Sequence, residues 1–121
     1  MTVALWILNI VLALVFLGAG VMHAFRPVDK LVESGMGWAG DMAPGLVKTI
    51  GILEILGAVG LIVPWTTGIA PILTPIAAIG LAIVMVGAIP THIRRQEPFT
   101  FQLVLGLLSV ASAVLGFLVV L

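Results

Sequence analysis

Long apolar stretches alternate along the chain with short segments that hold most of the charged residues. A helix needs roughly 20 apolar residues, at about 1.5 Å each, to cross a hydrocarbon core of about 30 Å. Four stretches approach that length, so we predict an all-α integral membrane four-helix bundle that forms a single transmembrane domain over residues 1–121. The predicted spans cover residues 3–24, 46–63, 71–93 and 99–121.

The connections between these spans differ in length and character. The first, residues 26–43, is the longest, and Pro27 and Gly35 suit the first turn and the end of a helix, which predicts a short interfacial helix between them. The segment around Trp38 is predicted to be flexible, with the tryptophan at the level of the headgroups, where it can cover the mouth of a cavity. Residues 64–68, which begin with Pro64, are predicted to form an uncharged turn.

Composition supports a membrane protein and excludes several functions. Of the 121 residues, 62% are hydrophobic and 8% are charged, which is too little polar surface to cover a soluble globule. The zero net charge and the lack of a basic stripe argue against nucleic acid as a partner. Because the chain has no cysteine, disulfide relays, cysteine-ligated iron–sulfur clusters and thiol nucleophiles are excluded.

The basic residues predict the orientation in the membrane. All of them flank the first and third connections, and cytoplasmic loops of membrane proteins carry an excess of Lys and Arg. We therefore predict a multi-pass protein of the cell membrane with residues 26–45 and 94–98 in the cytoplasm and both termini outside. The first stretch has no basic segment before it and no small-residue cleavage site, so we expect it to be retained as a helix. The basic residues are Arg26, Lys30, Lys48, Arg94 and Arg95.

Glu54 interrupts the second apolar stretch near its middle. A carboxylate is costly in hydrocarbon and by default marks a functional site. Desolvation disfavours the charged form, so we expect Glu54 to be protonated unless a cation or several donors reach it, and a neutral acid suits proton exchange or the binding of a polar headgroup. The alternative is a structural acid, bonded to Ser109 at matching depth on the fourth span or to a free backbone carbonyl, that fixes the register of the bundle.

His23 and His92 end the first and third spans on the same predicted side of the membrane, so both can face a vestibule above Glu54. Pro90 removes a backbone N–H and loosens the helix just before His92. A haem between the histidines is disfavoured because the bundle is small, and a metal site with Glu54 is disfavoured because the acid lies deeper. Taken singly, each histidine is expected to bond to headgroups or to loop carbonyls.

Small and polar residues recur at helical spacing, which predicts close packing of the spans. Asn9, in the first span, is expected to bond across to another helix. The fourth span has one such face, formed by Gln102, Gly106, Ser109, Ala113 and Gly116. Glycines of the second and third spans that suit packing are Gly51, Gly57, Gly80 and Gly87.

The chain resembles the DoxX-like family of small four-helix membrane proteins. The resemblance rests on residues 16–20 (FLGAG), residues 51–58 (GILEILGA) and residues 86–88 (VGA), the last of which lead to His92, and it covers nearly the whole chain. It implies a membrane bundle that is usually an accessory component, with some relatives linked to quinone-dependent sulfur oxidation or to oxidative-stress complexes. Such proteins often carry a lysine where His23 stands here.

The leading hypothesis is an accessory subunit of a membrane redox or stress-response complex, not an enzyme on its own, embedded in the lipid bilayer. Its cytoplasm-facing cavity, with His23, Glu54, His92 and Ser109 as site residues, would bind a quinone-like or lipid-like ligand or relay protons. A quinone is the cofactor that this hypothesis admits. Two alternatives stay open, namely a proton-coupled small-molecule transporter that acts as a homo-oligomer and a purely structural membrane anchor for a partner complex.

Overall fold

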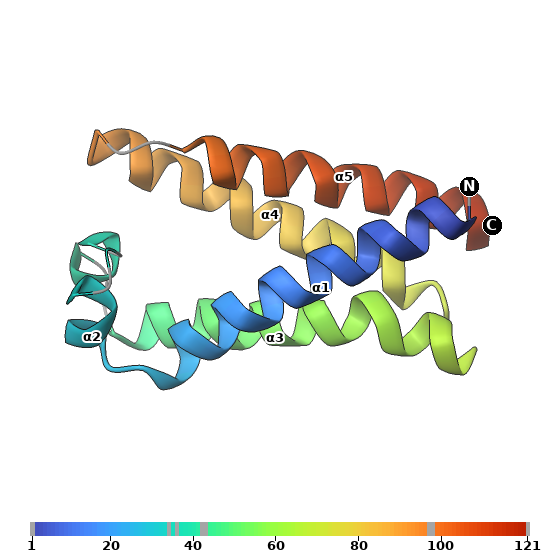
Figure 1. Ribbon diagram of the computed structural model, residues 1–121, viewed down its shortest axis with the longest axis horizontal. Helices are drawn as coiled ribbons and strands as arrows, with labels where there is room; N and C mark the ends of the chain where they lie inside the picture. Colours follow the sequence, from blue (N-terminus) through green and yellow to red (C-terminus); the bar gives the residue numbers. More distant parts are fainter. Residues whose placement is uncertain (1, 34, 36, 42–43, 97–98, 121) are drawn as a thin grey trace.

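The computed structural model describes residues 2–33, 35, 37–41, 44–96 and 99–120, and within them every regular element is helical (Figure 1). Four of these helices are long and apolar enough to cross a membrane, which confirms the predicted all-α membrane bundle. The long helices are α1 (Thr2–Phe25), α3 (Pro44–Thr67), α4 (Leu73–Arg94) and α5 (Thr100–Val120). The short ones are α2 (Val28–Glu33) and η1 (Gly37–Asp41).

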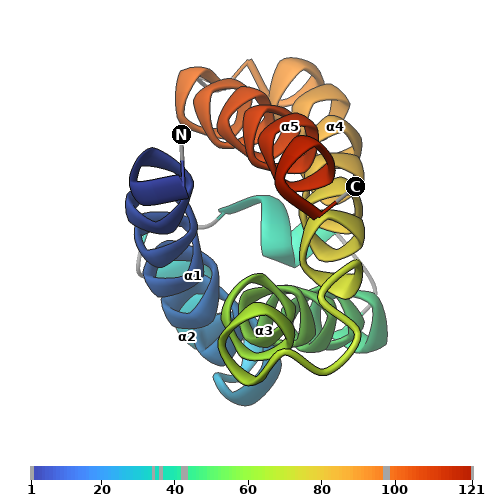
Figure 2. The same ribbon diagram turned by 90° about the vertical axis from the view of Figure 1, so that its right-hand side faces the viewer.

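The bundle has two chemically distinct ends. Both termini lie at one end, called here the terminal end, whereas α2 and η1 lie at the other, called the loop end (Figure 1). All the basic residues belong to segments at the loop end, namely Arg26 and Lys30 between α1 and α3, Lys48 near the start of α3, and Arg94 and Arg95 at the close of α4. Viewed from the terminal end, the four long helices surround the teal η1 segment, which lies behind the centre of the ring (Figure 2).

Glycines allow α1 and α3 to approach backbone to backbone. A Cβ on Gly20 would lie 2.7 Å from the carbonyl oxygen of Gly51, and a Cβ on Gly51 would collide with the backbone of Gly20, His23 and Ala24. The two helices therefore pack more closely than any side chain at these positions would allow. Gly80 and Gly87 behave differently, since a Cβ there would meet nothing within 4 Å, and the expectation that they serve helix packing is wrong.

The other helix contacts fill the terminal half of the bundle. Gly60 of α3 faces Ala77 of α4, where an added Cβ would lie 2.7 Å from the alanine Cβ, and Gly116 of α5 faces the ring of Pro75. The hydrophobic core draws on all four long helices. Its large buried side chains are Leu12, Phe16, Leu61, Leu81, Met85 and Leu105.

Helix α3 is longer than predicted, because it continues through Pro64 to Thr67 instead of turning there. The hydroxyl of Thr66 donates to the carbonyl of Ile62 and that of Thr67 donates to Val63, so side chains support the last turn. Trp65 stacks on Trp6 of α1, with ring centroids 4.6 Å apart. A proline is tolerated in this position because the tertiary contacts of the last turn offset the lost hydrogen bond.

The first connection folds against the bundle. The predicted short helix is confirmed as α2, and it is followed by Gly35 in the left-handed region, with φ of 99°. The segment around Trp38, predicted to be flexible, forms the η1 turn instead. Leu31, Ala39 and Val47 are fully buried together, so apolar contacts hold α2 and η1 to the start of α3.

Candidate functional site

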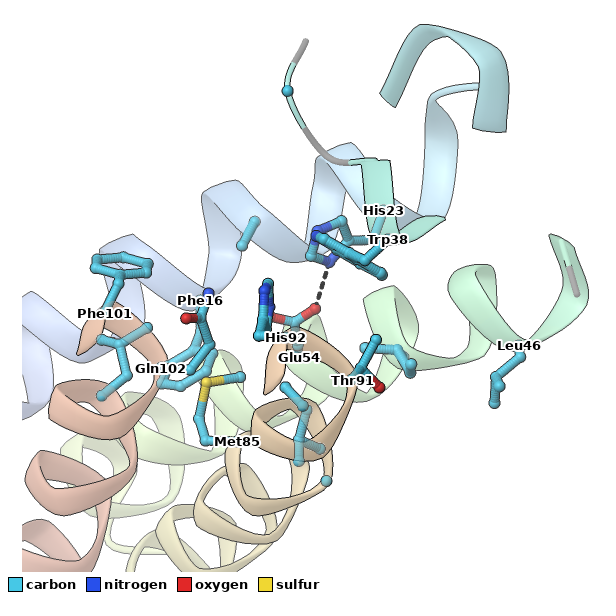
Figure 3. Close-up of a pocket in the computed structure, with 17 residues that line it drawn as sticks. Phe16, His23, Trp38, Leu46, Glu54, Met85, Thr91, His92, Phe101 and Gln102 are labelled. Atoms are coloured by element: carbon cyan, nitrogen blue, oxygen red, sulfur yellow. Dashed lines mark hydrogen bonds and ion pairs between the residues drawn. The ribbon is translucent and has the colours of Figure 1, made fainter. Parts of the chain in front are cut away.

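The acid of α3 is paired with a histidine of α1. His23 Nδ1 and Glu54 Oε1 lie 2.6 Å apart, and the residues are 8% and 2% exposed (Figure 3). A hydrogen bond of this length contains one proton between nitrogen and oxygen. The pair has no net charge wherever that proton resides, provided the other ring nitrogen carries its own hydrogen. Glu54 therefore has the partner that lets a carboxyl group exist in this apolar interior.

Two expectations from the sequence are wrong here. His23 does not bond to a headgroup or loop carbonyl through Nδ1, and its depth does not separate it from Glu54. Side chains on a helix lean toward its N-terminus. Because α1 and α3 are antiparallel, His23 leans into the bundle while Glu54 leans back toward the loop end, and the two meet. Lys48 takes a separate position, where its Nζ donates to the carbonyl of Ala24 at the end of α1.

Trp38 of η1 lies against both histidines. Its ring meets that of His23 edge-on, with centroids 5.1 Å apart, and meets that of His92 with centroids 6.3 Å apart. The indole therefore links the loop segment to side chains of α1 and α4. This position fits the expectation that the tryptophan covers a cavity mouth.

A pocket of about 660 Å³ lies beneath this tryptophan, at the loop end of the bundle (Figure 3). This volume is within the usual range for sites that bind small molecules. His23, Glu54 and His92 all line it, whereas most of its wall is apolar. The principal apolar side chains of the wall are Phe16, Leu46, Ile50, Val84, Met85, Phe101 and Leu105.

Two polar atoms of this pocket lack a hydrogen-bond partner. His92 is 8% exposed and its Nδ1 is buried, yet no donor or acceptor among the described residues reaches it. Gln102 of α5 is half-buried, and its Oε1 is likewise buried without a partner. Buried polar groups in proteins are nearly always hydrogen-bonded, so these two atoms are exceptions among the described residues.

Ser109 is placed apart from these residues. Its hydroxyl donates to the carbonyl of Leu105 within α5 at 2.8 Å, and it does not belong to the pocket wall. The structure thus brings together three of the four predicted site residues, His23, Glu54 and His92, and not the fourth. The alternative of a structural acid bonded to Ser109 does not describe Glu54, whose carboxyl group bonds to His23.

A separate polar cluster joins three helices in the terminal half. Asn9 of α1 donates from Nδ2 to the carbonyl of Leu61 on α3, at 3.3 Å. The hydroxyl of Ser112 on α5 donates to Asn9 Oδ1. The prediction that Asn9 bonds across to another helix is therefore confirmed, and its partners satisfy both ends of the amide.

Sequence reasoning anticipated Trp38 at the cavity mouth but missed the part that Gln102 plays in the pocket. Gln102 was identified only as part of a packing face, although it is the polar residue of that face nearest the loop end. Its position along the bundle could have identified it. The first turn of α5 adjoins the last turn of α4, which places Gln102 at the end of the bundle where His92 lies.

Comparison with known proteins identifies the family. The model of the DoxX-like family matches residues 7–115, which include every residue of the pocket wall. Comparisons with curated proteins and with solved structures give no match. Because the family match spans most of the chain and agrees with the four-helix membrane fold, the protein belongs to the DoxX-like family.

Proposed function

We propose that this protein binds an amphipathic ligand, of the quinone-like or lipid-like class, in the pocket at the loop end. In this proposal the ligand's polar head meets His92, Gln102 and the His23/Glu54 pair, while its apolar part lies against Phe16 and the other apolar residues of the wall. We propose that it serves a membrane redox or stress-response complex in this way as an accessory subunit, the role that the resemblance to the DoxX-like family implies.

The observation that carries the proposal is a largely apolar pocket of about 660 Å³ whose wall also holds three polar side chains, those of His23, Glu54 and His92. Polar groups in such a wall can fix the orientation of a ligand's polar head. The apolar wall favours a ligand with a hydrophobic body, and hydrophobic burial supplies most of the affinity in sites of this kind. Both properties together describe a molecule that dissolves in the bilayer.

The basic residues at the loop end support an orientation in which this pocket faces the cytoplasm and both termini lie outside. A ligand bound there would be held in the cytoplasmic half of the membrane. This is the half in which a partner in the cytoplasm or on the inner membrane surface can reach it.

A second candidate function rests on the His23/Glu54 pair. A hydrogen bond of 2.6 Å between a carboxyl group and an imidazole is an arrangement in which a proton can change partners. This geometry favours a proton-coupled small-molecule transporter that acts as a homo-oligomer over a purely structural anchor. Replacement of Glu54 by Gln tests it, because an anchor would keep its assembly and its cellular phenotype whereas a proton relay would fail.

The proposed ligand can be identified by purification in mild detergent at native expression, followed by mass spectrometry of the co-extracted small molecules and proteins. The matched variants are Ala88→Phe, which fills the pocket, and Val104→Phe, which adds a similar bulk to an exposed position outside it. We expect a ligand to co-purify with the wild type and with Val104→Phe, and to be lost from Ala88→Phe. Equal recovery from both variants would contradict the proposal.

A further inference from the structure

We propose that the pocket opens sideways into the bilayer between α3 and α4, and that its ligand is a long-chain amphiphile whose chain passes out through this opening. This inference rests on the proposed function and narrows the ligand to a molecule larger than the pocket that holds its head. It also assigns the source of the ligand, which is the membrane and not the cytoplasm. Leu46 of α3 and Gly87 of α4 border the opening.

Helices α3 and α4 are in contact near their middle and part toward the loop end. Gly57 of α3 packs against Leu81 of α4, where an added Cβ would lie 2.5 Å from the leucine side chain. Because the two helices are antiparallel, seven residues back along α3 correspond to seven residues onward along α4, which sets Ile50 opposite Ala88. Both of these residues line the pocket, and Figure 1 shows α4 rising away from α3 toward the loop end. The pocket therefore extends between the two helices.

The pocket reaches the outer surface of the bundle on this side. Leu46 is 49% exposed and Gly87 is also exposed, yet both belong to the pocket wall. A residue that lines a pocket and is exposed as well marks a place where the pocket meets the surroundings. Both residues belong to helices that are long and apolar enough to cross a membrane, so the surroundings here are the bilayer.

Gly87 leaves this edge of the wall without a side chain. An added Cβ would meet nothing within 4 Å, so the backbone alone borders the opening on α4. Phe101 of α5 also lines the pocket and is 61% exposed, but there an aromatic side chain occupies the edge. The opening for a chain is therefore assigned to the side of Gly87.

The chemistry of the wall gives the ligand a direction. The polar side chains of His23, Glu54 and His92 are almost fully buried, whereas the exposed residues at the opening are Leu46 and Gly87. A polar head is thus held inside and an apolar chain points outward. A volume of about 660 Å³ suits a drug-sized molecule, so the long chain of a membrane lipid must lie partly outside it, where the bilayer solvates the chain.

The test uses two monoacylglycerols, one with a long acyl chain and one with a short acyl chain, each carrying a photoreactive diazirine close to its ester. The protein is illuminated in phosphatidylcholine vesicles, and mass spectrometry locates the labelled residues. Phe16 and Leu105 are the reporters, because both line the pocket and are only 0% and 7% exposed, so a probe reaches them from within the pocket. We expect both probes to label them in the wild type.

Bulky residues on both sides of the opening should exclude the long chain alone. In Leu46→Phe/Gly87→Phe, we expect labelling of the reporters by the long probe, relative to the short probe, to fall at least about ten-fold, because the chain loses its path into the bilayer. Retained labelling by the short probe shows that the variant is folded.

The matched control is Leu53→Phe/Gly80→Phe, which makes the same substitutions on the same two helices. Leu53 is 48% exposed, an added Cβ on Gly80 would meet nothing within 4 Å, and neither residue belongs to the pocket wall. This variant should keep the wild-type ratio of the two probes.

The outcomes separate this inference from the proposed function. An unchanged ratio in Leu46→Phe/Gly87→Phe overturns the inference, and so does an equal fall in the control variant. If only the short probe labels the reporters in the wild type, the pocket takes amphiphiles but has no exit for their chains, so the inference fails while the proposed function stands. If neither probe labels Phe16 or Leu105, both proposals fail.

Discussion

At the terminal end of the bundle, Asn9 bonds to Leu61 and receives a hydrogen bond from Ser112, so that three helices share one satisfied cluster. At the loop end, His23 and Glu54 bond to each other, but His92 Nδ1 nearby has no partner among the described residues. Both ends bury polar groups in an apolar bundle. At the terminal end the Asn9 cluster joins helices, and the buried hydroxyl of Thr74, which has no partner among the described residues, lies outside the wall of the pocket at the loop end. At the loop end, the His23/Glu54 pair and His92 belong to that wall.

The difference extends to the packing. In the terminal half, Gly60 and Gly116 allow α3 to meet α4 and α5 to meet α4 closely. In the loop half, α1 and α3 make such a contact through Gly20 and Gly51, and the space between this pair of helices and the α4–α5 pair is the pocket that holds the polar side chains. The close helix contacts can hold the bundle together while the loop end keeps a hollow lined by polar and apolar groups.

The largest effect is expected from separating the buried acid and base. His23→Leu leaves Glu54 without its partner, and we expect the free energy of unfolding in mixed micelles to fall by roughly 3 kcal/mol. The double variant His23→Leu/Glu54→Leu removes both polar groups, and a buried pair replaced by apolar residues is often neutral. If the double variant is as unstable as the single one, the pair does not matter as a pair and the loop end resembles ordinary core.

A smaller loss is expected at the glycine contact that holds this pair together. Gly51→Ala places a methyl group against the backbone of α1, at a cost of about 2 kcal/mol, and moves His23 away from Glu54. Gly80→Ala is its control, because the methyl group meets open space there and the helix gains up to about 1 kcal/mol. Thermal unfolding followed by circular dichroism measures both. Similar stabilities for the two variants would show that α1 and α3 tolerate a wider spacing.

Removal of unpartnered groups should change stability in the opposite direction. His92→Leu replaces a buried atom that has no bond, so we expect the ligand-free protein to gain about 1 kcal/mol. Thr74→Val does the same for the hydroxyl of Thr74, which is buried without a partner in the first turn of α4 and outside the pocket wall. Only His92→Leu should also weaken ligand binding. A loss of stability in His92→Leu would mean that its ring is already satisfied.

The smallest effect concerns the cluster at the terminal end. A double-mutant cycle of Asn9→Ala and Ser112→Ala should give a coupling energy of about 0.6 kcal/mol, the average for hydrogen bonds between membrane helices. The same cycle for Asn9→Ala and Ser109→Ala provides the control, because Ser109 bonds within its own helix. A coupling as large for the control pair would argue that the cluster acts through general packing.

The apolar pattern was sufficient to predict the four spans, and the positions of the basic residues were sufficient to predict that these residues gather at one end of the bundle. It did not predict the end of α3, because a proline normally marks a boundary and only the contact between Trp65 and Trp6, which are far apart in sequence, supports the extra turn. Long-range contacts of this kind have no signature within a single segment.

The site was predicted in its residue types more than in its geometry. Glu54 stood out because an acid in hydrocarbon is costly, and both histidines were placed at the correct end. The predicted difference in depth between Glu54 and His23 was wrong because depth was counted along the helix axis. A long side chain reaches about one turn toward the N-terminus of its own helix, so side chains on antiparallel helices can meet. Gln102 has no such local signal, since a glutamine near a helix start is common at a membrane surface.

The close contact between Gly37 and Arg95 limits which residues the first loop can carry at position 37. A Cβ on residue 37 would lie 2.6 Å from the guanidinium of Arg95, so the end of α4 occupies the space that a side chain next to Trp38 would need. A larger residue at position 37 would displace either the Arg95 side chain or the η1 turn, and with the turn the indole of Trp38 that lies against the two histidines. The cover of the pocket thus depends on two parts of the chain that are distant in sequence.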